Sequence, residues 1–184
     1  MKKLVVLALF LSTAFAASAQ FELKINPIGT LFGRPDLSAE IGLPSNFGLE
    51  VGAGTFFGTN NVADIEFRRS GFTGFAAGKY YFSDKDHKGF TAGLYTDFRN
   101  IKREATDNQF ENDNYTRRAL GVGLLIGVKA VGESGFLFET DLGLGRNFVN
   151  RLEFADEDNA TINLTDIPFV NLNFLFRVAI GYRF

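Results

Sequence analysis

The sequence predicts an all-β fold, an eight-stranded antiparallel up-and-down barrel that crosses a membrane. Apolar and polar side chains alternate along most of the chain, which is the period of a β-strand. Charged residues and glycines share one face of each expected strand, and large apolar residues share the other. Phe occurs 22 times and Gly 20 times, and abundant Gly disfavours helices.

The alternation is clearest over residues 119–129, where every even position from Leu120 to Val128 is a large aliphatic residue. Most odd positions there are small, and Leu125 is the large exception. Pro27 cannot donate to a strand ladder, so we expect a bulge or strand shift near Asn26 and Pro27. The eight expected strands cover residues 21–32, 37–43, 47–54, 72–82, 90–99, 119–129, 136–145 and 170–184.

The links between these strands alternate in length. Short links are expected at residues 44–46, 83–88 and 131–134, and long links at 58–70, 100–116 and 147–168. Outer-membrane barrels have short periplasmic turns and longer outer loops. We therefore expect both termini on the periplasmic side, with the link near residues 33–35 as the one short outer link.

The N-terminus has the pattern of an export signal. Lys2 and Lys3 precede a short apolar run over residues 4–11, and small residues for cleavage follow at 17–19. The expected domains are a cleaved signal peptide, residues 1–19, and one outer-membrane barrel domain, residues 20–184. The chain has no Cys, which excludes disulfides and thiolate metal sites. Its formal net charge of −2 becomes −4 without the two lysines, so nothing indicates nucleic-acid binding.

The charges identify the face that points inward. The interior of an eight-stranded barrel is just wide enough for side chains to fill. In a soluble, lipocalin-like barrel the many Phe and Leu side chains would have to point inward, and they cannot all fit there. We therefore expect them to face lipid, with the charges forming a network in the lumen. The expected lumen charge network is Lys24, Glu40, Glu50, Lys79, Asp97, Arg99, Lys129, Glu139, Asp141 and Arg177.

Strand length and aromatic placement agree with a membrane span. An eleven-residue strand such as 119–129 is roughly 36 Å long and, tilted by about 40°, spans roughly 28 Å. Aromatic residues gather at the expected periplasmic strand ends, which is typical of an interfacial girdle. They are Phe21, Phe47, Tyr80, Phe82, Phe90, Phe136, Tyr182 and Phe184.

The alternating strands and the C-terminal Arg177-Val-Ala-Ile-Gly-Tyr-Arg-Phe184 resemble small outer-membrane barrels of the OmpA and OmpX type. The resemblance implies that Tyr182 and Phe184 form the signal read by the barrel-assembly machinery. Residues 24–29, 37–40 and 78–82 are more similar still to a family of small barrels from Bacteroidota, a domain of unknown function with no established chemistry to transfer. Both resemblances mark architecture rather than activity.

Enzymatic chemistry has little support in the residues. His87 is the only His, and it lies in a charged turn expected on the periplasmic side. The resemblance to outer-membrane lipid-A deacylases and acyltransferases requires a His with a Ser near the outer leaflet, so His87 is interpreted as a solvated turn residue. No nucleophile elbow, phosphate-binding glycine loop or HExxH motif is present.

Carboxylates could still act as an acid and a base. Asp97, Glu139 and Asp141 are expected on neighbouring inner faces. Lys129 and Arg99 lie among them, and buried charges must be paired. An internal salt-bridge network is therefore favoured over catalysis.

The link at residues 147–168 is acidic, and oxygen-rich loops can bind Ca²⁺. The run from Asp156 to Thr161 lacks the Gly and the distal Glu of an EF-hand, so a solvated acidic loop is favoured. Its charged residues are Arg151, Glu153, Asp156, Glu157, Asp158 and Asp166.

The sequence therefore predicts a non-enzymatic, integral outer-membrane protein of a Gram-negative cell, with a charged, side-chain-plugged lumen and a structural or surface-loop interaction role. We expect no catalytic residue, no cofactor and no metal site. The expected partners are outer-membrane lipid and the barrel-assembly machinery, with the protein a monomer. The alternatives are a lipid-modifying outer-membrane enzyme and a porin-like, narrow channel for small solutes.

Overall fold

The computed structural model describes residues 20–62, 65–83, 86–105, 114–154, 161–165, 167 and 169–184. The expected signal peptide, residues 1–19, lies outside them. The described residues form nine β-strands and one short helix. The elements are β1 (Phe21–Ile25), α2 (Pro27–Leu31), β2 (Asp36–Leu43), β3 (Phe47–Val62), β4 (Ile65–Tyr81), β5 (Gly89–Ala105), β6 (Tyr115–Val131), β7 (Phe136–Phe154), β8 (Thr161–Asn163) and β9 (Leu172–Arg183).

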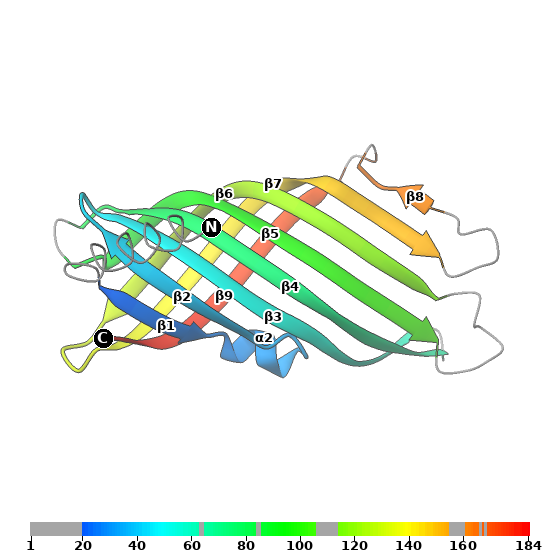
Figure 1. Ribbon diagram of the computed structural model, residues 1–184, viewed down its shortest axis with the longest axis horizontal. Coiled ribbons are helices and arrows are strands. Elements are labelled where there is room, and N and C mark those ends of the chain that lie inside the picture. Colours follow the sequence, from blue (N-terminus) through cyan, green and yellow to red (C-terminus); the bar gives the residue numbers. More distant parts are fainter. Residues whose placement is uncertain are drawn as a thin grey trace, which may run out of the picture.

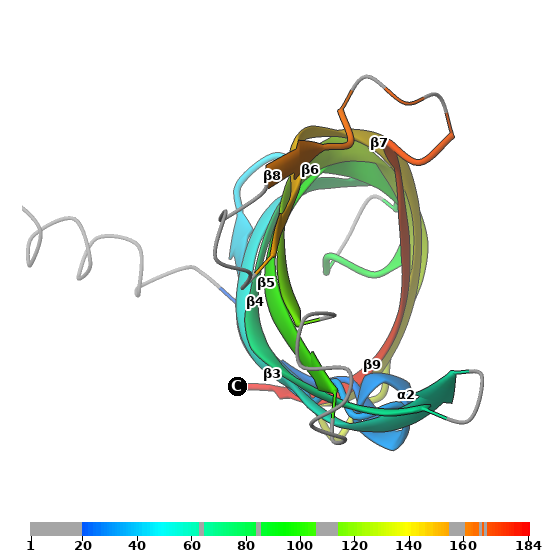
Figure 2. The ribbon, with the colours of Figure 1, turned by 90° about the vertical axis from the view of Figure 1, so that its right-hand side faces the viewer.

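All nine strands belong to one antiparallel sheet that closes into a ring (Figures 1 and 2). The strand order is β6-β5-β4-β3-β2-β1-β9-β7-β8, and a further pairing of β6 with β7 completes the circuit. The all-β antiparallel prediction is therefore confirmed. β8 pairs only with β7, over Arg151–Glu153, and so adds a strand outside the circuit.

The strand count differs from the expected eight because of β8. This strand lies within residues 147–168, which the sequence predicts as a loop. The same stretch also contains the end of β7, which continues to Phe154. β8 has only three residues, Thr161-Ile162-Asn163, and is too short to show an alternation. At the end of β7, Asn150, Arg151 and Glu153 interrupt the apolar alternation.

The other predicted long links are shorter than expected for the same reason. β3 continues to Val62 and β4 begins at Ile65, inside the expected link 58–70. β5 continues to Ala105 and β6 begins at Tyr115, inside the expected link 100–116. The ladder between β4 and β5 runs through basic residues such as Arg68 and Arg103. Alternation of apolar and polar residues marks only the part of a strand that has one face in an apolar environment. These strand extensions lie outside that part.

The first expected strand, residues 21–32, ends at Ile25 and gives way to α2. The Asn26 side chain caps this helix by accepting a hydrogen bond from the Gly29 backbone N–H at 2.8 Å. Pro27 occupies the first helical turn, where its missing N–H costs nothing. The break expected at these two residues is thus a switch from strand to helix.

Because β1 ends at Ile25, the ring has a seam, by which we mean the short ladder between β1 and β9. β1 pairs with β9 only over Glu22–Ile25, whereas β9 extends back to Leu172. The helix α2 lies against β9, and the link after it pairs with β3. Backbone N–H groups of Thr55 and Phe57 donate to the carbonyls of Pro35 at 3.0 Å and Gly33 at 2.9 Å. A helix and a loop therefore fill the space between β3 and β9.

The two ends of the ring differ, and we call them the turn end and the far end. The turn end carries the links at residues 44–46 and 132–135 and the C-terminal Phe184. Ser45 and Asn46 both have φ of 64°, a left-handed conformation that short-side-chain residues such as Asn adopt in tight turns. The far end is where β3 stops at Val62 and β5 at Ala105. The chain enters and leaves the ring at the turn end (Figure 1).

Candidate functional site

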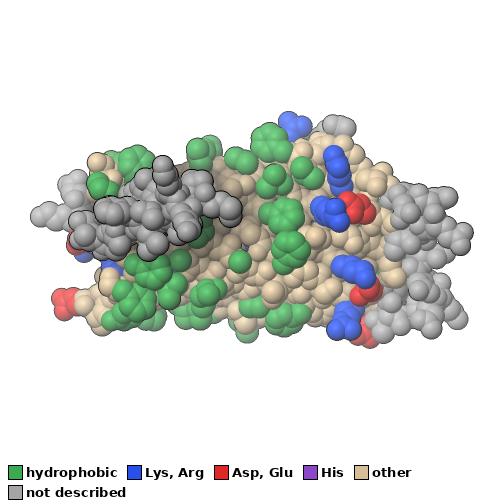
Figure 3. Space-filling model, in the orientation of Figure 1, with side chains coloured by type: hydrophobic (Ala, Val, Ile, Leu, Met, Phe, Trp, Pro, Cys, Tyr) green, Lys and Arg blue, Asp and Glu red, His purple; other side chains and the backbone are tan. Residues whose placement is uncertain are grey.

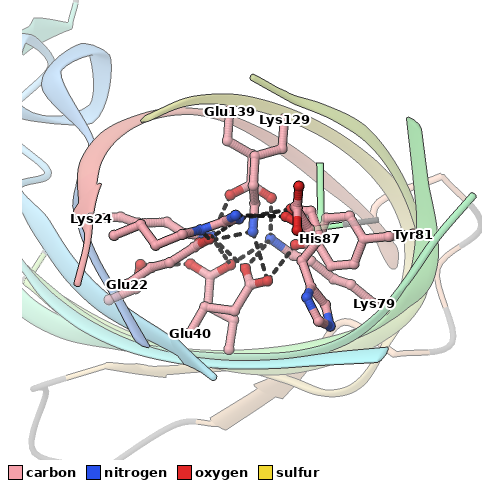
Figure 4. Close-up of polar contacts among 12 residues, drawn as sticks. Glu22, Lys24, Glu40, Lys79, Tyr81, His87, Lys129 and Glu139 are labelled. Atoms are coloured by element: carbon pink, nitrogen blue, oxygen red, sulfur yellow. Dashed lines mark hydrogen bonds and ion pairs between the residues drawn. The ribbon is translucent and has the colours of Figure 1, made fainter. Parts of the chain in front are cut away.

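The interior at the turn end contains a cluster of ion pairs, which we call the turn-end cluster. Lys24 on β1 lies at its centre, and its side chain is 1% exposed. The Lys24 ammonium contacts the carboxylates of Glu40 and Glu139 and lies 3.2 Å from Glu50 Oε2. The three consecutive strands β1, β2 and β3 and the distant strand β7 thus point charged side chains at one another, as Figure 4 shows for Lys24, Glu40 and Glu139.

Two further lysines complete this arrangement. Lys79 on β4 contacts Glu139 and donates to Glu50 Oε2 at 2.5 Å. Lys129 on β6 donates to Glu40 Oε1 at 2.7 Å and to Glu22 Oε2 at 2.8 Å. Each of these carboxylates therefore meets at least one ammonium group. The attraction between the paired groups offsets the desolvation cost of burying them.

Guanidinium groups close the cluster at its two edges. Arg177 Nη1 on β9 lies 2.6 Å from Glu50 Oε1, and the other terminal nitrogen donates to Ser38 Oγ at 2.5 Å. Arg183 donates two hydrogen bonds to Glu22 Oε1, at 2.9 and 2.6 Å. The turn-end cluster consists of Glu22, Lys24, Glu40, Glu50, Lys79, Lys129, Glu139, Asp141, Arg177 and Arg183. It holds five basic and five acidic side chains.

Eight of the ten residues expected in a lumen network lie in this cluster. Asp97 and Arg99 do not. They pair with each other, with Arg99 Nε 2.6 Å from Asp97 Oδ2, and both contact the Asn173 side chain nearer the far end. Asp97 is buried, whereas the Arg99 side chain is 22% exposed.

Sequence reasoning missed three participants. Glu22 and Arg183 belong to the cluster, and the Tyr81 hydroxyl donates to Glu40. Each lies on the same strand face as a predicted member. Glu22 is two residues before Lys24, and Tyr81 is two residues after Lys79. Extending the alternation to the strand ends finds them.

An apolar layer separates the cluster from the far end. Ala77, Tyr95, Leu125 and Leu175 pack together inside the ring, with Phe75 against them. They come from β4, β5, β6 and β9. On β6 the layer residue Leu125 lies between Lys129 and the far end, and on β4 Ala77 lies beyond Lys79. The one large apolar residue on the inner face of residues 119–129 is therefore part of this layer.

His87 closes the turn end, and it is less solvated than expected. Its side chain is half-buried, and its ring packs edge-on against Tyr81 with centroids 5.4 Å apart. Its Nε2 lies 2.8 Å from the Leu43 carbonyl oxygen, so this nitrogen carries the proton. Among the described residues, no Ser, Thr or carboxylate is hydrogen-bonded to the ring. His87 lacks the partner that a nucleophilic or acid–base role needs.

Two triads of carboxylates have the spacing of metal ligands, namely Glu22, Glu40 and Glu139, and Glu50, Glu139 and Asp141. In each triad, lysine ammonium groups already contact the carboxylate oxygens. The donor set is therefore neutralised by the chain itself, and it does not fit an additional cation.

The exterior of the ring is apolar over its middle. Outward side chains of β6 such as Leu124 and Ile126 are 67% and 58% exposed, as are many Phe and Leu side chains of other strands. All eight aromatic residues expected in a girdle are exposed. Several of their rings touch, including Phe47 with Tyr80 and Tyr182 with Phe184, at 5.2 and 5.1 Å between centroids. A row of basic and acidic side chains follows toward the far end (Figure 3).

The fold is similar to that of a solved outer-membrane protein. A major outer membrane protein from Thermus thermophilus superimposes with a TM-score of 0.54, covering 91% of this chain and 100% of that chain at 15% identity. This likeness shows the fold, an antiparallel sheet that closes into a ring. No family model and no curated protein matches the chain. In the described part of the chain, no helix has the length and hydropathy to cross a membrane.

The structure describes only part of the expected acidic loop. Glu153 lies on β7, 3.3 Å from Arg118 Nη2. Asp156, Glu157, Asp158 and Asp166 lie outside the described residues. The resemblance to a Bacteroidota family stays a prediction, because nothing in the fold distinguishes that family from other small barrels.

Proposed function

We propose that this chain is an integral outer-membrane protein without enzymatic activity, an eight-stranded up-and-down barrel whose lumen is plugged by its own side chains. One observation carries the proposal. The ring places exposed apolar side chains outside and a neutralised set of buried charges inside. A continuous apolar exterior is stable only in lipid. β8 is then an extension of one outer hairpin rather than a member of the barrel.

The turn-end cluster and the apolar layer favour a plug over a channel. A pore that conducts ions keeps water and unpaired charge along its path. Here five cations and five anions contact one another and are almost all buried. Tyr95 and Leu125, 2% and 1% exposed, then fill the interior above them. Asp36 and Asn26 lie beside Arg177 next to this layer, so the plug rests on side chains that fill the lumen and not on an unbroken apolar barrier.

The role that fits a plugged barrel is structural, or the display of outer loops for interaction. Outer-membrane lipid is the partner that the apolar exterior requires. The barrel-assembly machinery is the partner that Tyr182 and Phe184 at the end of β9 would engage during biogenesis. The first and last strands of one chain pair with each other, so the protein needs no second copy to close and we expect a monomer.

Two measurements on the full-length mature protein test this proposal. Barrels stay folded in SDS until heated, so the unheated protein should migrate faster on a gel than the boiled protein. The same sample in planar bilayers should be nearly silent, because the cluster blocks the lumen. An open porin in the same lipid is the positive control for detecting conductance.

The two results separate the parts of the proposal. Absence of a heat-dependent shift would contradict the membrane barrel itself. A heat-dependent shift together with large, stable conductance steps would retain the barrel and replace the plug with the channel alternative.

A further inference from the structure

Five arginines line the interior at the far end, and we call them the far-end arginines. Arg99 and Arg103 share the inward face of β5 with the buried Asp97. Arg69 on β4 and Arg117 on β6 have the same parity as the inward residues of their strands. Arg34, in the link after α2, lies over the inward Phe56 ring at 5.5 Å.

These side chains are close enough to repel one another. Arg69 and Arg103 are direct cross-strand partners. The cross-strand partner of Arg117 is Ile101, which lies between Arg99 and Arg103 on β5. Arg99 interacts unfavourably with both Arg34 and Arg117. Like charges directly opposite each other destabilise a sheet.

The outward neighbours on the same strands show that the imbalance is specific to the interior. Lys102 pairs with Glu104 on the outer face of β5. Arg118 pairs with Glu153, with Nη2 3.3 Å from Oε2. Arg68 has Glu104 as its cross-strand partner. Each of these outward cations therefore has an acidic neighbour.

The inward cations have few such partners in the described part of the chain. Asp97 pairs with Arg99, and Asp36 and Asp97 both attract Arg34. Arg117 has only a neutral acceptor, the Asn150 amide oxygen at 3.1 Å, and Arg103 has only the Tyr115 ring, at 5.6 Å. The Nε atoms of Arg34 and Arg69 are buried without a hydrogen-bond acceptor among the described residues.

We propose that the far-end arginines bind a phosphate-bearing anion that enters from the far end. Guanidinium groups present planar pairs of donors that match phosphate oxygens. An anion at this position would supply the missing counter-charge and the missing acceptors together. Arg69, Arg99, Arg103 and Arg117 lie on the other side of the apolar layer from the turn-end cluster, whereas Arg34 lines a small cavity together with Arg177.

The test uses inorganic pyrophosphate as the probe, titrated calorimetrically into the full-length mature protein in an uncharged detergent. Two strands, β5 and β6, offer matched variants in which adjacent residues face in opposite directions. Arg103→Gln and Arg117→Gln remove inward charge, and Lys102→Gln and Arg118→Gln remove outward charge. The heat-dependent gel shift confirms that each variant is folded.

The wild type should bind pyrophosphate saturably. Each inward variant should weaken binding on the order of tenfold, the effect of losing one charge-assisted hydrogen bond. Each outward variant should bind like the wild type. Absence of saturable binding would overturn the site, and it is the result expected if the chain's own acidic residues at 155–160 neutralise the arginines. Equal weakening by inward and outward variants would also overturn it.

A second arm identifies the source of the phosphate. The titration is repeated in lipid nanodiscs with and without phosphatidic acid. Competition by phosphatidic acid would assign the site to a lipid headgroup, and unchanged affinity would assign it to a soluble phosphate compound. The binding result depends only on the closed ring, so it stands apart from the conductance test of the plug.

Discussion

Five cations and five anions meet at the turn end of the interior, whereas the far end holds five arginines and, among the described residues, only two neighbouring carboxylates, Asp36 and Asp97. Both regions use the inward positions of the same strands. On β4 the two are represented by Lys79 and Arg69, ten residues apart. The two regions therefore differ in how far opposite charges neutralise each other.

If the far-end arginines bind an anion as proposed, this comparison separates charges that serve the fold from charges that serve a ligand. The turn-end cluster balances its charges internally, although both Asp141 oxygens lack a hydrogen-bond donor among the described residues and the nearest cations, Lys79 and Arg177, lie 3.5 and 3.6 Å from Oδ2. The far-end arginines are not balanced in this way, and their mutual repulsion is a cost that the fold accepts. Charge removal should therefore have opposite effects in the two regions.

The largest effect is expected from Lys79→Met in the turn-end cluster. Lys79 contacts Glu50 and Glu139 and is fully buried. Its loss leaves buried carboxylates unpaired, which should lower the free energy of unfolding by about 3–5 kcal/mol. Urea titration in lipid vesicles, followed by the heat-dependent gel shift, measures this change.

The double variant Lys79→Met with Glu139→Gln should recover part of that loss, because it removes one of the stranded charges. Lys88→Met, at an exposed turn lysine, is the control and should change stability little. If the double variant is no more stable than Lys79→Met alone, mutual neutralisation is not what holds the cluster.

The apolar layer that separates the two regions gives the next effect. Leu125→Ala leaves a cavity among Ala77, Tyr95 and Leu175, and should cost about 2–5 kcal/mol in the same urea titration. The adjacent Leu124→Ala removes the same atoms from the outer face, where lipid can fill the space, so its loss should be smaller. Equal losses at 124 and 125 would contradict the assignment of inner and outer faces.

The smallest effect has the opposite sign. Arg103→Gln removes a charge that faces Arg69 directly, so it should raise stability by up to about 1 kcal/mol. The gain should shrink at high salt because screening already weakens the repulsion. Lys102→Gln, which removes an exposed ion pair with Glu104, should be close to neutral. A loss in Arg103→Gln comparable to that in Lys79→Met would show that the far-end arginines are neutralised within the protein.

The alternation in the sequence predicts the parts of the strands that face lipid, because there each outward position must be apolar. It does not predict the extensions such as residues 65–71 of β4, where the outward positions Glu66, Arg68 and Ser70 are polar. The far-end arginines at positions 69, 103 and 117 fall in or beside stretches that the sequence assigns to loops. Alternation alone therefore does not place them on an inner face.

Pairing within the turn-end cluster is also beyond the sequence. Lys129 and Glu139 are neighbours in the ladder between β6 and β7. The Lys129 ammonium nevertheless reaches across the ring to Glu22 and Glu40 on β1 and β2. Alternation gives the face of a side chain, but the partner depends on how the closed sheet brings distant strands together.

The seam between β1 and β9 makes the ring mechanically uneven. β3 and β4 are joined along Phe47–Val62, whereas the chain's first and last strands are joined only along Glu22–Ile25. Opening the ring at this seam breaks the shortest ladder in the circuit and exposes the fewest backbone groups. Amide hydrogens of β1 and of residues 180–183 should therefore exchange with solvent before those of β3 to β7. The helix α2, which packs against β9 beside that ladder, then stabilises the ladder of the ring that we expect to open first.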